Sequence, residues 1–584
     1  MASQAAVLHP PSKQQIAQAI GRTLPAELSQ SPLVGILGVV LGAGIVTLTG
    51  RMLTLGSPDL KGALGIGVDD GAWLSSAYNV ALMFIGPFTV YIGGLLGPRR
   101  VLQFAAVTFT LVCLFLPLIH SYSLLLTALV IAGLTSGTFY PLTLTFALKN
   151  IPPRFLPFTL ALYATSVDFA VNIAPSLYGW YREHLSFHWM FWNSALITPF
   201  MILCIHYGIP PPPPRKSAGP PSFAGFLYAS AGFALLFAAL DQGQRLDWWR
   251  SGLFNGLFFS GMVFLLASLV RRLRSPNPLV DLPYLRQWNT IVLGVALGFF
   301  RFCLLATIIL IPQALAIHGF EANQIGPAVV WTAAPQFLIA FVAALLLLHE
   351  VDSRFLMAAG FTCIAAACIL NAYYTSVWSA ENFYRTELLL GVGQSFAFIG
   401  LVSTIVLQAI FSGGLSKAQD ALTFSAFFHI IRLLGGQMGV VLMGHYIAVR
   451  ERIHSNLLGL HVQGGNWLDD ASIRQMTAGL YAKSSGLAAA TGRAVGVVNG
   501  RVRLQAYTLS FIDGFHLVAW ACVVALLLVA LLRKSALNYG ELGFPDREAA
   551  AKRGQSHDPT HGTFLRRAFT NFRGRPRRTG DESA

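Results

Sequence analysis

Charged side chains are scarce in this sequence. Asp, Glu, Lys and Arg together make up 11% of its 584 residues, whereas hydrophobic residues make up 54%. A soluble domain carries roughly 25% charged residues, so the composition argues against one. The sequence also lacks a Gly-rich loop followed by Lys and Ser or Thr, a paired-histidine metal motif and a nucleophile elbow. We therefore expect no enzymatic activity, no cofactor, no metal and no ATP-driven pump, so energy must come from an ion gradient or the substrate's own gradient.

Cysteine is rare as well. None of the six cysteines has metal-ligand spacing, and all of them fall inside apolar runs: Cys113, Cys204, Cys303, Cys363, Cys368 and Cys522. We interpret them as small packing residues and infer neither disulfides nor a metal site. The first 30 residues are polar and contain Pro, without the apolar core of a cleavable signal peptide.

Long apolar runs dominate what is present. Fourteen of them alternate with short polar connections between Leu33 and Leu532, including residues 101–119, 223–240, 252–270 and 325–348. A bilayer core about 30 Å thick needs about 20 apolar residues at 1.5 Å per residue. The sequence therefore predicts an all-α polytopic membrane protein with 14 transmembrane helices.

Basic residues are unevenly distributed between the short connections. The connections that an even-numbered topology places inside contain Arg99, Arg100, Lys149, Arg154, Arg215, Lys216, Arg271, Arg272, Arg274, Arg286, Arg354 and Lys417. The opposite connections contain Lys61, Arg182, Arg245, Arg250 and Arg385. This bias predicts a multi-pass protein of the inner (plasma) membrane with both termini in the cytoplasm. The net charge of +15 then reflects topology, and we expect no nucleic-acid partner.

The runs fall into a six-plus-two-plus-six layout, which is typical of secondary transporters built from two related bundles. We expect a cytoplasmic N-terminal segment (1–32), an N-terminal six-helix bundle (33–208), a Pro-rich cytoplasmic linker (209–222), an inserted transmembrane hairpin (223–271), a cytoplasmic connection (272–288), a C-terminal six-helix bundle (289–533) that includes a periplasmic loop (450–507), and a basic disordered cytoplasmic tail (534–584).

Several segments resemble one family of transporters. Residues 240–251 read Leu-Asp-Gln-Gly-Gln-Arg-Leu-Asp-Trp-Trp-Arg-Ser, and residues 277–282 read Asn-Pro-Leu-Val-Asp-Leu. Both resemble segments of EmrB/QacA-type 14-span drug:proton antiporters of the major facilitator superfamily. Supporting similarities occur in the same order along the chain, at Trp73 and Tyr78 and at residues 188–193, 312–313 and 432–439. The resemblance covers about residues 33–533 and implies the major facilitator fold, two six-helix bundles plus the inserted hairpin.

The resemblance also marks structural motif residues: Gly97, Arg99, Arg100, Pro175, Gly179, Asp241, Asp247 and Trp248. In other places the chain departs from the family. Thr49 stands where span one of the family has an acidic residue, and Leu129 stands where span four has a buried Arg. The loop at residues 93–100 keeps its Gly and its basic pair but lacks the family's acid. The usual coupling residues of the family are thus missing.

Ionisable residues inside spans are the candidates that remain, because each costs about 2.5–3.5 kcal/mol on insertion scales and rarely faces lipid. Asp168 lies near the middle of span five, between Ser166 and Asn172. We hypothesise that Asp168 is the proton or cation site, with Arg51 as its conditional partner. Arg51 differs from it in depth by roughly 10 Å, which snorkelling could partly close. The alternatives are a static pair that joins spans one and five, or an Arg51 that reaches the outer head groups.

Arg301 in span nine and Arg432 in span thirteen make the interior of the C-terminal bundle positive. Together with Asn172 and His429, we interpret them as cavity or substrate residues. Such a cavity favours anionic or carboxylate-bearing amphiphiles. The alternatives are that Arg432 bonds backbone carbonyls and that His429 is a packing residue, although it lies at i−3 from Arg432 on the same helix face.

The leading prediction is an exporter of amphipathic small molecules that works by alternating access with proton antiport. A dedicated exporter of one endogenous metabolite, including an anionic one, and an uncoupled membrane sensor or assembly component are the alternatives. The expected partners are a small-molecule substrate and the lipid bilayer. The resemblance adds a periplasmic adaptor and an outer-membrane channel. The 450–507 segment, which contains a helical-looking stretch at residues 468–487, is a candidate docking surface.

Overall fold

The computed structural model describes residues 32–151, 155–209, 223–274, 287–411, 418–462, 465–533 and 539. The chain divides into two compact units, Met1–Gly543 and Phe544–Ala584, and all described residues belong to the first. The expected N-terminal segment apart from Pro32, nearly all of the Pro-rich linker, most of the cytoplasmic connection and the basic tail apart from Tyr539 lie outside the described residues.

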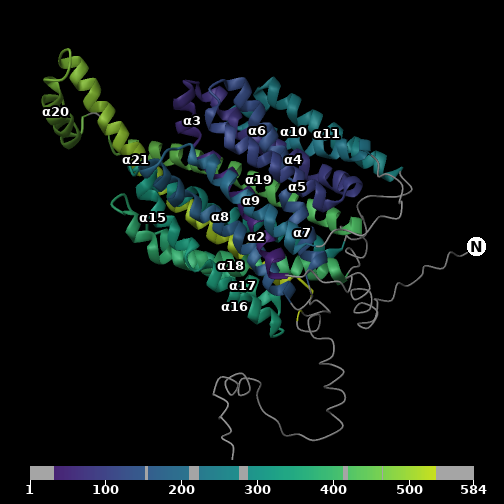
Figure 1. Ribbon diagram of the computed structural model, residues 1–584. Helices are drawn as coiled ribbons and strands as arrows, with labels where there is room; N and C mark the ends of the chain where they lie inside the picture. Colours follow the sequence, from purple (N-terminus) through teal and green to yellow (C-terminus); the bar gives the residue numbers. More distant parts are fainter. Residues whose placement is uncertain are drawn as a thin grey trace, which may run out of the picture. The chain divides into compact units, whose positions relative to one another are not determined.

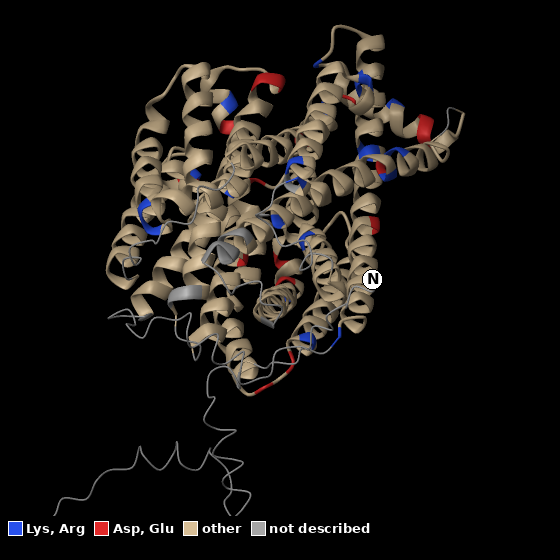
Figure 2. Cartoon of the chain, turned by 90° about the vertical axis from the view of Figure 1, so that its right-hand side faces the viewer, with Lys and Arg blue, Asp and Glu red and all other residues tan. Residues whose placement is uncertain are grey.

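The described residues contain 14 helices that are long and apolar enough to cross a membrane. This confirms the predicted all-α polytopic fold. The N-terminal bundle consists of α2 (Pro32–Leu55), α4 (Val68–Leu96), α5 (Pro98–Phe115), α6 (Tyr122–Ser136) continued by α7 (Phe139–Asn150), α8 (Leu156–His184) and α9 (Trp189–Gly208), with the short α3 (Ser57–Leu64) after α2. Figure 2 shows how few Lys, Arg, Asp and Glu residues lie along these helices.

The C-terminal bundle follows the same plan. Its spans are α13 (Trp288–Cys303) continued through a π-helical turn, η4 (Ala306–Leu310), into α14 (Ile311–Ile317); α15 (Ala322–Ala333) continued by α16 (Gln336–Leu348); α17 (Ser353–Asn371); α18 (Ala380–Phe411); α19 (Ala418–Gly459); and α21 (Leu487–Ala530). Small residues let α19 approach α13: a Cβ on Gly435 would lie 3.5 Å from the Cα of Gly298, and one on Gly439 would lie 3.5 Å from the Cα of Phe302.

The inserted hairpin consists of α10 (Phe223–Gly243) and α11 (Gly252–Leu273), joined through a short turn, η3 (Trp248–Arg250). A Cβ on Gly232 would lie 3.0 Å from the carbonyl oxygen of Gly261, so the two helices pack closely. α10 packs against α4 of one bundle and α19 of the other, whereas α11 packs mainly against α10. The hairpin therefore contacts both bundles through one helix (Figure 1).

The segment expected to be a periplasmic loop is largely helical. α19 continues to Gly459, α20 spans Trp467–Tyr481, and α21 begins at Leu487. With 42 and 44 residues, α19 and α21 each measure about 60 Å, roughly twice the bilayer core. Figure 1 shows α20 and the adjoining part of α21 away from the other helices. We call residues 450–507 the helical extension; its polar composition predicted a loop because composition does not separate a solvated helix from a loop.

Candidate functional site

Asp168 lies in the middle of α8, inside the protein. Only 1% of its surface is exposed, and no described residue forms a hydrogen bond with its Oδ1 atom. The adjacent hydroxyl of Ser166 is not a partner, because it donates to the backbone carbonyl of Tyr163 at 2.8 Å. A buried carboxylate with an unbonded oxygen is costly unless a cation compensates its charge or a proton neutralises it.

The cations that act on Asp168 come from the other bundle. Arg301 of α13 and Arg432 of α19 both interact electrostatically with it. We call Asp168, Arg301 and Arg432 the central charge cluster. Since α8 belongs to the N-terminal bundle and both arginines belong to the C-terminal bundle, this attraction acts across the interface between the bundles.

Arg432 is bound by a tyrosine of the opposite bundle. Its Nη1 donates a hydrogen bond of 2.7 Å to the hydroxyl of Tyr140, and its guanidinium carbon lies 3.7 Å from the centre of that ring. The Tyr140 hydroxyl lies 2.7 Å from Thr47 Oγ1 on α2. Arg432 therefore contacts α7 directly and α2 through one intermediate, instead of bonding a backbone carbonyl.

His429 packs beside this pair. Its ring stacks on that of Tyr140 with centroids 5.3 Å apart, and a Cβ on Gly86 of α4 would lie 3.1 Å from its Cδ2 atom. It is 1% exposed, and no described residue forms an ion pair with it. The geometry matches that of a packing histidine between α4 and α7, and a role in substrate binding stays a prediction.

Arg301 is held differently from Arg432. Its guanidinium lies over Gly436 of α19, where a Cβ would be 3.1 Å from Nη2 and 3.3 Å from Nε. Within the described residues, no group accepts a hydrogen bond from its buried Nε and Nη1 atoms. Arg301 thus has two buried donor atoms without a described acceptor, and the lack of a side chain at Gly436 lets its guanidinium lie against α19.

A chain of neutral side chains also crosses between the bundles. Asn172 Nδ2 of α8 donates to Gln394 Oε1 of α18 at 2.8 Å, and Gln394 Nε2 donates to Thr307 Oγ1 of η4 at 2.8 Å. Asn172 was predicted as a cavity residue; Gln394, Thr307 and Tyr140 were not. The sequence contained a signal for these three residues, because an amide or hydroxyl group in the middle of a span needs a hydrogen-bond partner there.

Arg51 does not pair with Asp168. Its Nη2 donates a hydrogen bond of 2.9 Å to the backbone carbonyl of Ile308, in the π-helical turn of the other bundle. That carbonyl lacks its usual α-helical donor because the residue four positions on is Pro312, which has no N–H. The structure therefore corrects the proposed pairing, and it also replaces the idea that Arg51 reaches the outer head groups.

Further contacts between the bundles lie on the same side as the Arg51–Ile308 bond, which is the predicted periplasmic side. The Ser176 hydroxyl of α8 donates to the carbonyl of Gly326 in α15 at 2.5 Å. One turn further along α8, a Cβ on Gly179 would lie 2.8 Å from the carbonyl oxygen of Ala322. Gly179 of the predicted Pro175–Gly179 motif thus permits close packing of α8 on α15, and Pro175 lies buried within α8.

The bundles also touch on the predicted cytoplasmic side. Thr145 Oγ1 of α7 donates to Ser425 Oγ of α19 at 3.2 Å. On this side Gly97 adopts a positive φ of 88° at the start of α5, and Arg99 Nη2 donates to the carbonyl of His206 at 2.7 Å within the N-terminal bundle. Arg100 is exposed. The described parts of the two bundles are thus in contact on both sides of the interface.

Asp241 joins the inserted hairpin to both bundles. Its carboxylate accepts hydrogen bonds from the Ser76 hydroxyl of α4, from Gln242 Nε2 and, at 2.8 Å, from Gln437 Nε2 of α19. All of these donors are neutral. Asp241, which the family motif marked, therefore links three parts of the fold.

The other two motif residues of this loop shape its turn. Asp247 and Trp248 have positive φ angles of 58° and 52°. Asp247 forms an exposed ion pair of 3.2 Å with Arg250, and the Trp248 ring packs against Gly243. Their roles are thus local to the turn.

Glu387 is a second buried carboxyl group inside a span. It is fully buried in α18, where one carboxylate oxygen is hydrogen-bonded to the Thr332 hydroxyl of α15. No described residue partners its Oε1 atom. Glu387 thus joins two helices of the C-terminal bundle.

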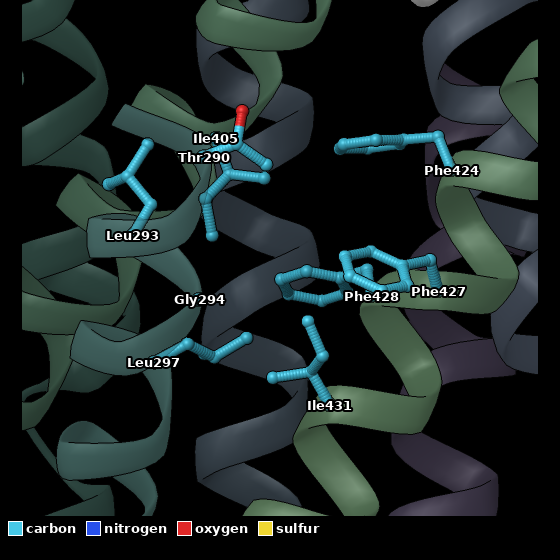
Figure 3. Close-up of a pocket in the computed structure, with 9 residues that line it drawn as sticks. All are labelled: Thr290, Leu293, Gly294, Leu297, Ile405, Phe424, Phe427, Phe428 and Ile431. Carbon is cyan, nitrogen blue, oxygen red and sulfur yellow. The ribbon is translucent and has the colours of Figure 1, made fainter. Parts of the chain in front are cut away.

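An apolar pocket lies between α13, α18 and α19. It is lined by Thr290, Leu293, Gly294, Leu297, Ile405, Phe424, Phe427, Phe428 and Ile431 (Figure 3). In Figure 3, Leu293 and Leu297 of α13 face the phenylalanine rings of α19 across the pocket. Its cavity of about 20 Å³ has room for about one water molecule.

A sequence model of the Major Facilitator Superfamily matches residues 39–440, which is more than half of the chain. The chain belongs to the Major Facilitator Superfamily. Members of this superfamily are generally carriers of small molecules, not enzymes. The helices, bundles and polar interface described above are those of a multi-pass carrier.

Individual members of the superfamily are similar over most of their length. The fatty acid resistance protein FarB of Neisseria gonorrhoeae is 24% identical and covers 77% of this chain and 86% of FarB. The probable multidrug resistance protein EmrY of Escherichia coli is 25% identical over 88% of this chain and 97% of EmrY. The multidrug export protein EmrB of Escherichia coli is 23% identical over 81% and 90%, respectively. The resemblance to EmrB-type exporters is thereby confirmed.

Proposed function

We propose that this protein is a secondary exporter of amphipathic small molecules, driven by proton antiport through alternating access. The functions for which its relatives are named, multidrug export and fatty acid resistance, support export of amphipathic compounds. We further propose that it resides in the inner membrane with both termini in the cytoplasm, as the distribution of basic residues indicates.

One observation carries the coupling proposal: the only carboxylate of the central charge cluster belongs to one bundle, and both of its arginines belong to the other. While Asp168 is charged, it attracts Arg301 and Arg432 and holds the bundles together at mid-depth. A proton on Asp168 removes that attraction and leaves two like charges. An interaction of about 2.7 kcal/mol changes a conformational equilibrium about a hundredfold, so loss of an electrostatic attraction of this size can control rocking.

An antiporter must not change conformation while it is empty, since that would uncouple substrate from proton. The attraction within the central charge cluster provides such a restraint, and protonation of Asp168 releases it. Arg51–Ile308 and Ser176–Gly326 on one side, and Thr145–Ser425 on the other, are contacts that opening toward each side must break.

Dye efflux from cells expressing the protein, measured with and without a proton uncoupler, tests this proposal. We expect uncoupler-sensitive efflux that is lost in Asp168→Asn at normal expression, and partly kept in Asp168→Glu, which retains the charge. Full uncoupler-sensitive efflux by Asp168→Asn rejects the coupling role. Export of one compound without dye efflux favours a dedicated metabolite exporter, and no transport at all favours a sensor or assembly role.

We propose the helical extension as the docking surface for a periplasmic adaptor that leads to an outer-membrane channel. Along α19, Val449, Ile453 and Leu457 are 37–53% exposed. Their spacing of four residues places them on one helix face, where they form an apolar stripe suited to another helix. Replacing Ile453 and Leu457 by Glu should abolish adaptor crosslinking in cells but leave transport by purified protein in liposomes unchanged. Unaltered crosslinking contradicts this docking surface.

A further inference from the structure

Arg301 has hydrogen-bonding capacity that the described protein leaves unused. Its Nε and Nη1 atoms are buried without a described acceptor, although its guanidinium is at mid-depth in the span. Burying an unpaired charge is strongly unfavourable, so such a group is normally compensated. The lack of a side chain at Gly436 lets the guanidinium lie directly against α19.

Basic groups outnumber carboxyl groups around Arg301. The central charge cluster contains two guanidinium groups, those of Arg301 and Arg432, and one carboxyl group, that of Asp168. Arg432 has a neutral partner in the Tyr140 hydroxyl, whereas Arg301 has none among the described residues. A single negative charge at Arg301 would balance the cluster, and a carboxylate matches the fork geometry of a guanidinium.

The apolar pocket lies next to this cation on the same helix. Gly294, Leu297 and Arg301 are spaced i, i+3 and i+7 and hence share one face of α13. Leu297 and Thr290 line the pocket from four to eleven residues before Arg301, which is roughly 6–16 Å along the axis. Opposite them, Phe424 and Phe428 precede Arg432 by two turns and one turn of α19.

We propose that α13 and α19 form a binding site for a singly charged amphipathic carboxylate. The head group binds the open donors of Arg301 above Gly436, and the apolar part lies among the phenylalanine rings of the pocket (Figure 3). This inference rests on the proposed function and specifies its substrate class. A cationic amphiphile would be repelled by both arginines, and a neutral one would leave Arg301 unpaired.

The apolar pocket is too small for a substrate in this conformation. A cavity of about 20 Å³ admits no organic ligand, so the bundles must separate or the rings must turn before one binds. A carboxylate at Arg301 also competes with Asp168 for the same guanidinium. Substrate binding therefore weakens the attraction between the bundles, as protonation of Asp168 does.

Binding of radiolabelled decanoate to the purified full-length protein in lipid nanodiscs tests the site without requiring transport. We expect unlabelled decanoate to displace the label, and decyltrimethylammonium and decanol not to. Arg301→Gln should weaken binding at least tenfold, and Arg301→Lys less because it keeps the charge. Arg385→Gln, which removes an exposed arginine elsewhere, should bind as the wild type does.

Two further variants separate the head-group and tail contributions. Phe428→Ala should weaken binding of decanoate but have little effect on competition by butanoate, which has almost no tail. Gly436→Leu should weaken both by displacing the Arg301 guanidinium. Thermal unfolding of each variant checks that the protein is folded, and Arg301→Lys keeps the test decisive should Arg301→Gln not fold.

The outcomes distinguish this site from the general function. Equal decanoate affinity in folded Arg301→Gln, or displacement by decyltrimethylammonium, overturns the carboxylate site. If decanoate does not bind the wild type while dye efflux remains uncoupler-sensitive, the site is wrong and the proposed exporter function stands. If decanoate binds through Arg301 but no efflux is coupled to protons, the site stands and the coupling proposal fails.

Discussion

Arg51 of α2 donates a hydrogen bond of 2.9 Å to the backbone carbonyl of Ile308, and this bond joins the two bundles on the predicted periplasmic side. Its acceptor exists because of Pro312, which cannot supply the N–H that would satisfy the Ile308 carbonyl within an α-helix. π-helical turns are frequent at functional sites, and here one presents a carbonyl to the opposite bundle.

Arg51→Ala should therefore destabilise closure of the periplasmic side, because it removes a charge-assisted hydrogen bond worth about 1.5–3 kcal/mol. We expect a larger outward-open population. The rate at which a cysteine placed at Ser176 reacts with a membrane-impermeant thiol reagent reports this population and should rise at least fivefold. Arg385→Ala, at an exposed position on the same side, serves as the control. An unchanged labelling rate in Arg51→Ala contradicts a closing role for this bond.

The hydroxyl of Tyr140 should matter to transport, whereas that of Tyr163 should not. Tyr140 accepts a hydrogen bond from Arg432 and contacts Thr47, but no described residue partners the buried Tyr163 hydroxyl. Tyr140→Phe leaves a buried guanidinium nitrogen unbonded at a cost of about 1–3 kcal/mol. We expect at least a fivefold loss of efflux and a lower melting temperature. Tyr163→Phe removes an unpaired polar group and should preserve efflux with equal or higher stability.

The sequence alone predicted the spans and the charged residues of the interior, but not the contacts between them. The number of spans, their lengths and the superfamily followed from apolar runs and from the loop at residues 240–251, since bilayer thickness leaves few alternatives. The charged residues of the interior were also recognisable, because intramembrane charges are rare. Which partners these residues contact could not be predicted from the sequence. Arg51 shows this, because it binds the backbone carbonyl of Ile308, 257 residues away in the sequence. That carbonyl is available because Pro312 cannot supply the N–H of an α-helix.

Neutral residues were the main omission. Tyr140, Gln394 and Thr307 have no charge to mark them within an apolar span, yet they provide several of the hydrogen bonds between the bundles. The helical extension was predicted only in part: residues 468–487 were expected to be helical, but the continuation of α19 and α21 was not. Polar residues continue these helices beyond the membrane. The apolar run therefore ends with the span, although the helix itself continues.

Asp241 should be needed to hold the inserted hairpin between the bundles. Its two oxygens accept from three side chains, and the single oxygen of an asparagine cannot replace them. Asp241→Asn should accelerate hydrogen exchange in α10 and reduce efflux severalfold. Asp247→Asn is the matched control: it removes an exposed ion pair with Arg250, worth about 0.2–1 kcal/mol. Equal exchange rates for both variants would show that the Asp241 contacts do not hold the hairpin.

Gly179 should be required for closure of the periplasmic side because of its lack of a side chain. A Cβ there would lie 2.8 Å from the carbonyl oxygen of Ala322 and 2.9 Å from the Cα of Asn323, both of which are backbone atoms that cannot turn away. Gly179→Ala must therefore push α15 away from α8, although alanine is the better helix former by about 1 kcal/mol. We expect faster thiol labelling at position 176 together with reduced efflux. As a control, Gly256→Ala should change neither quantity, because a Cβ at that position has no atom within 4 Å. Normal labelling and efflux in Gly179→Ala would mean that transport does not require such close packing of α8 and α15.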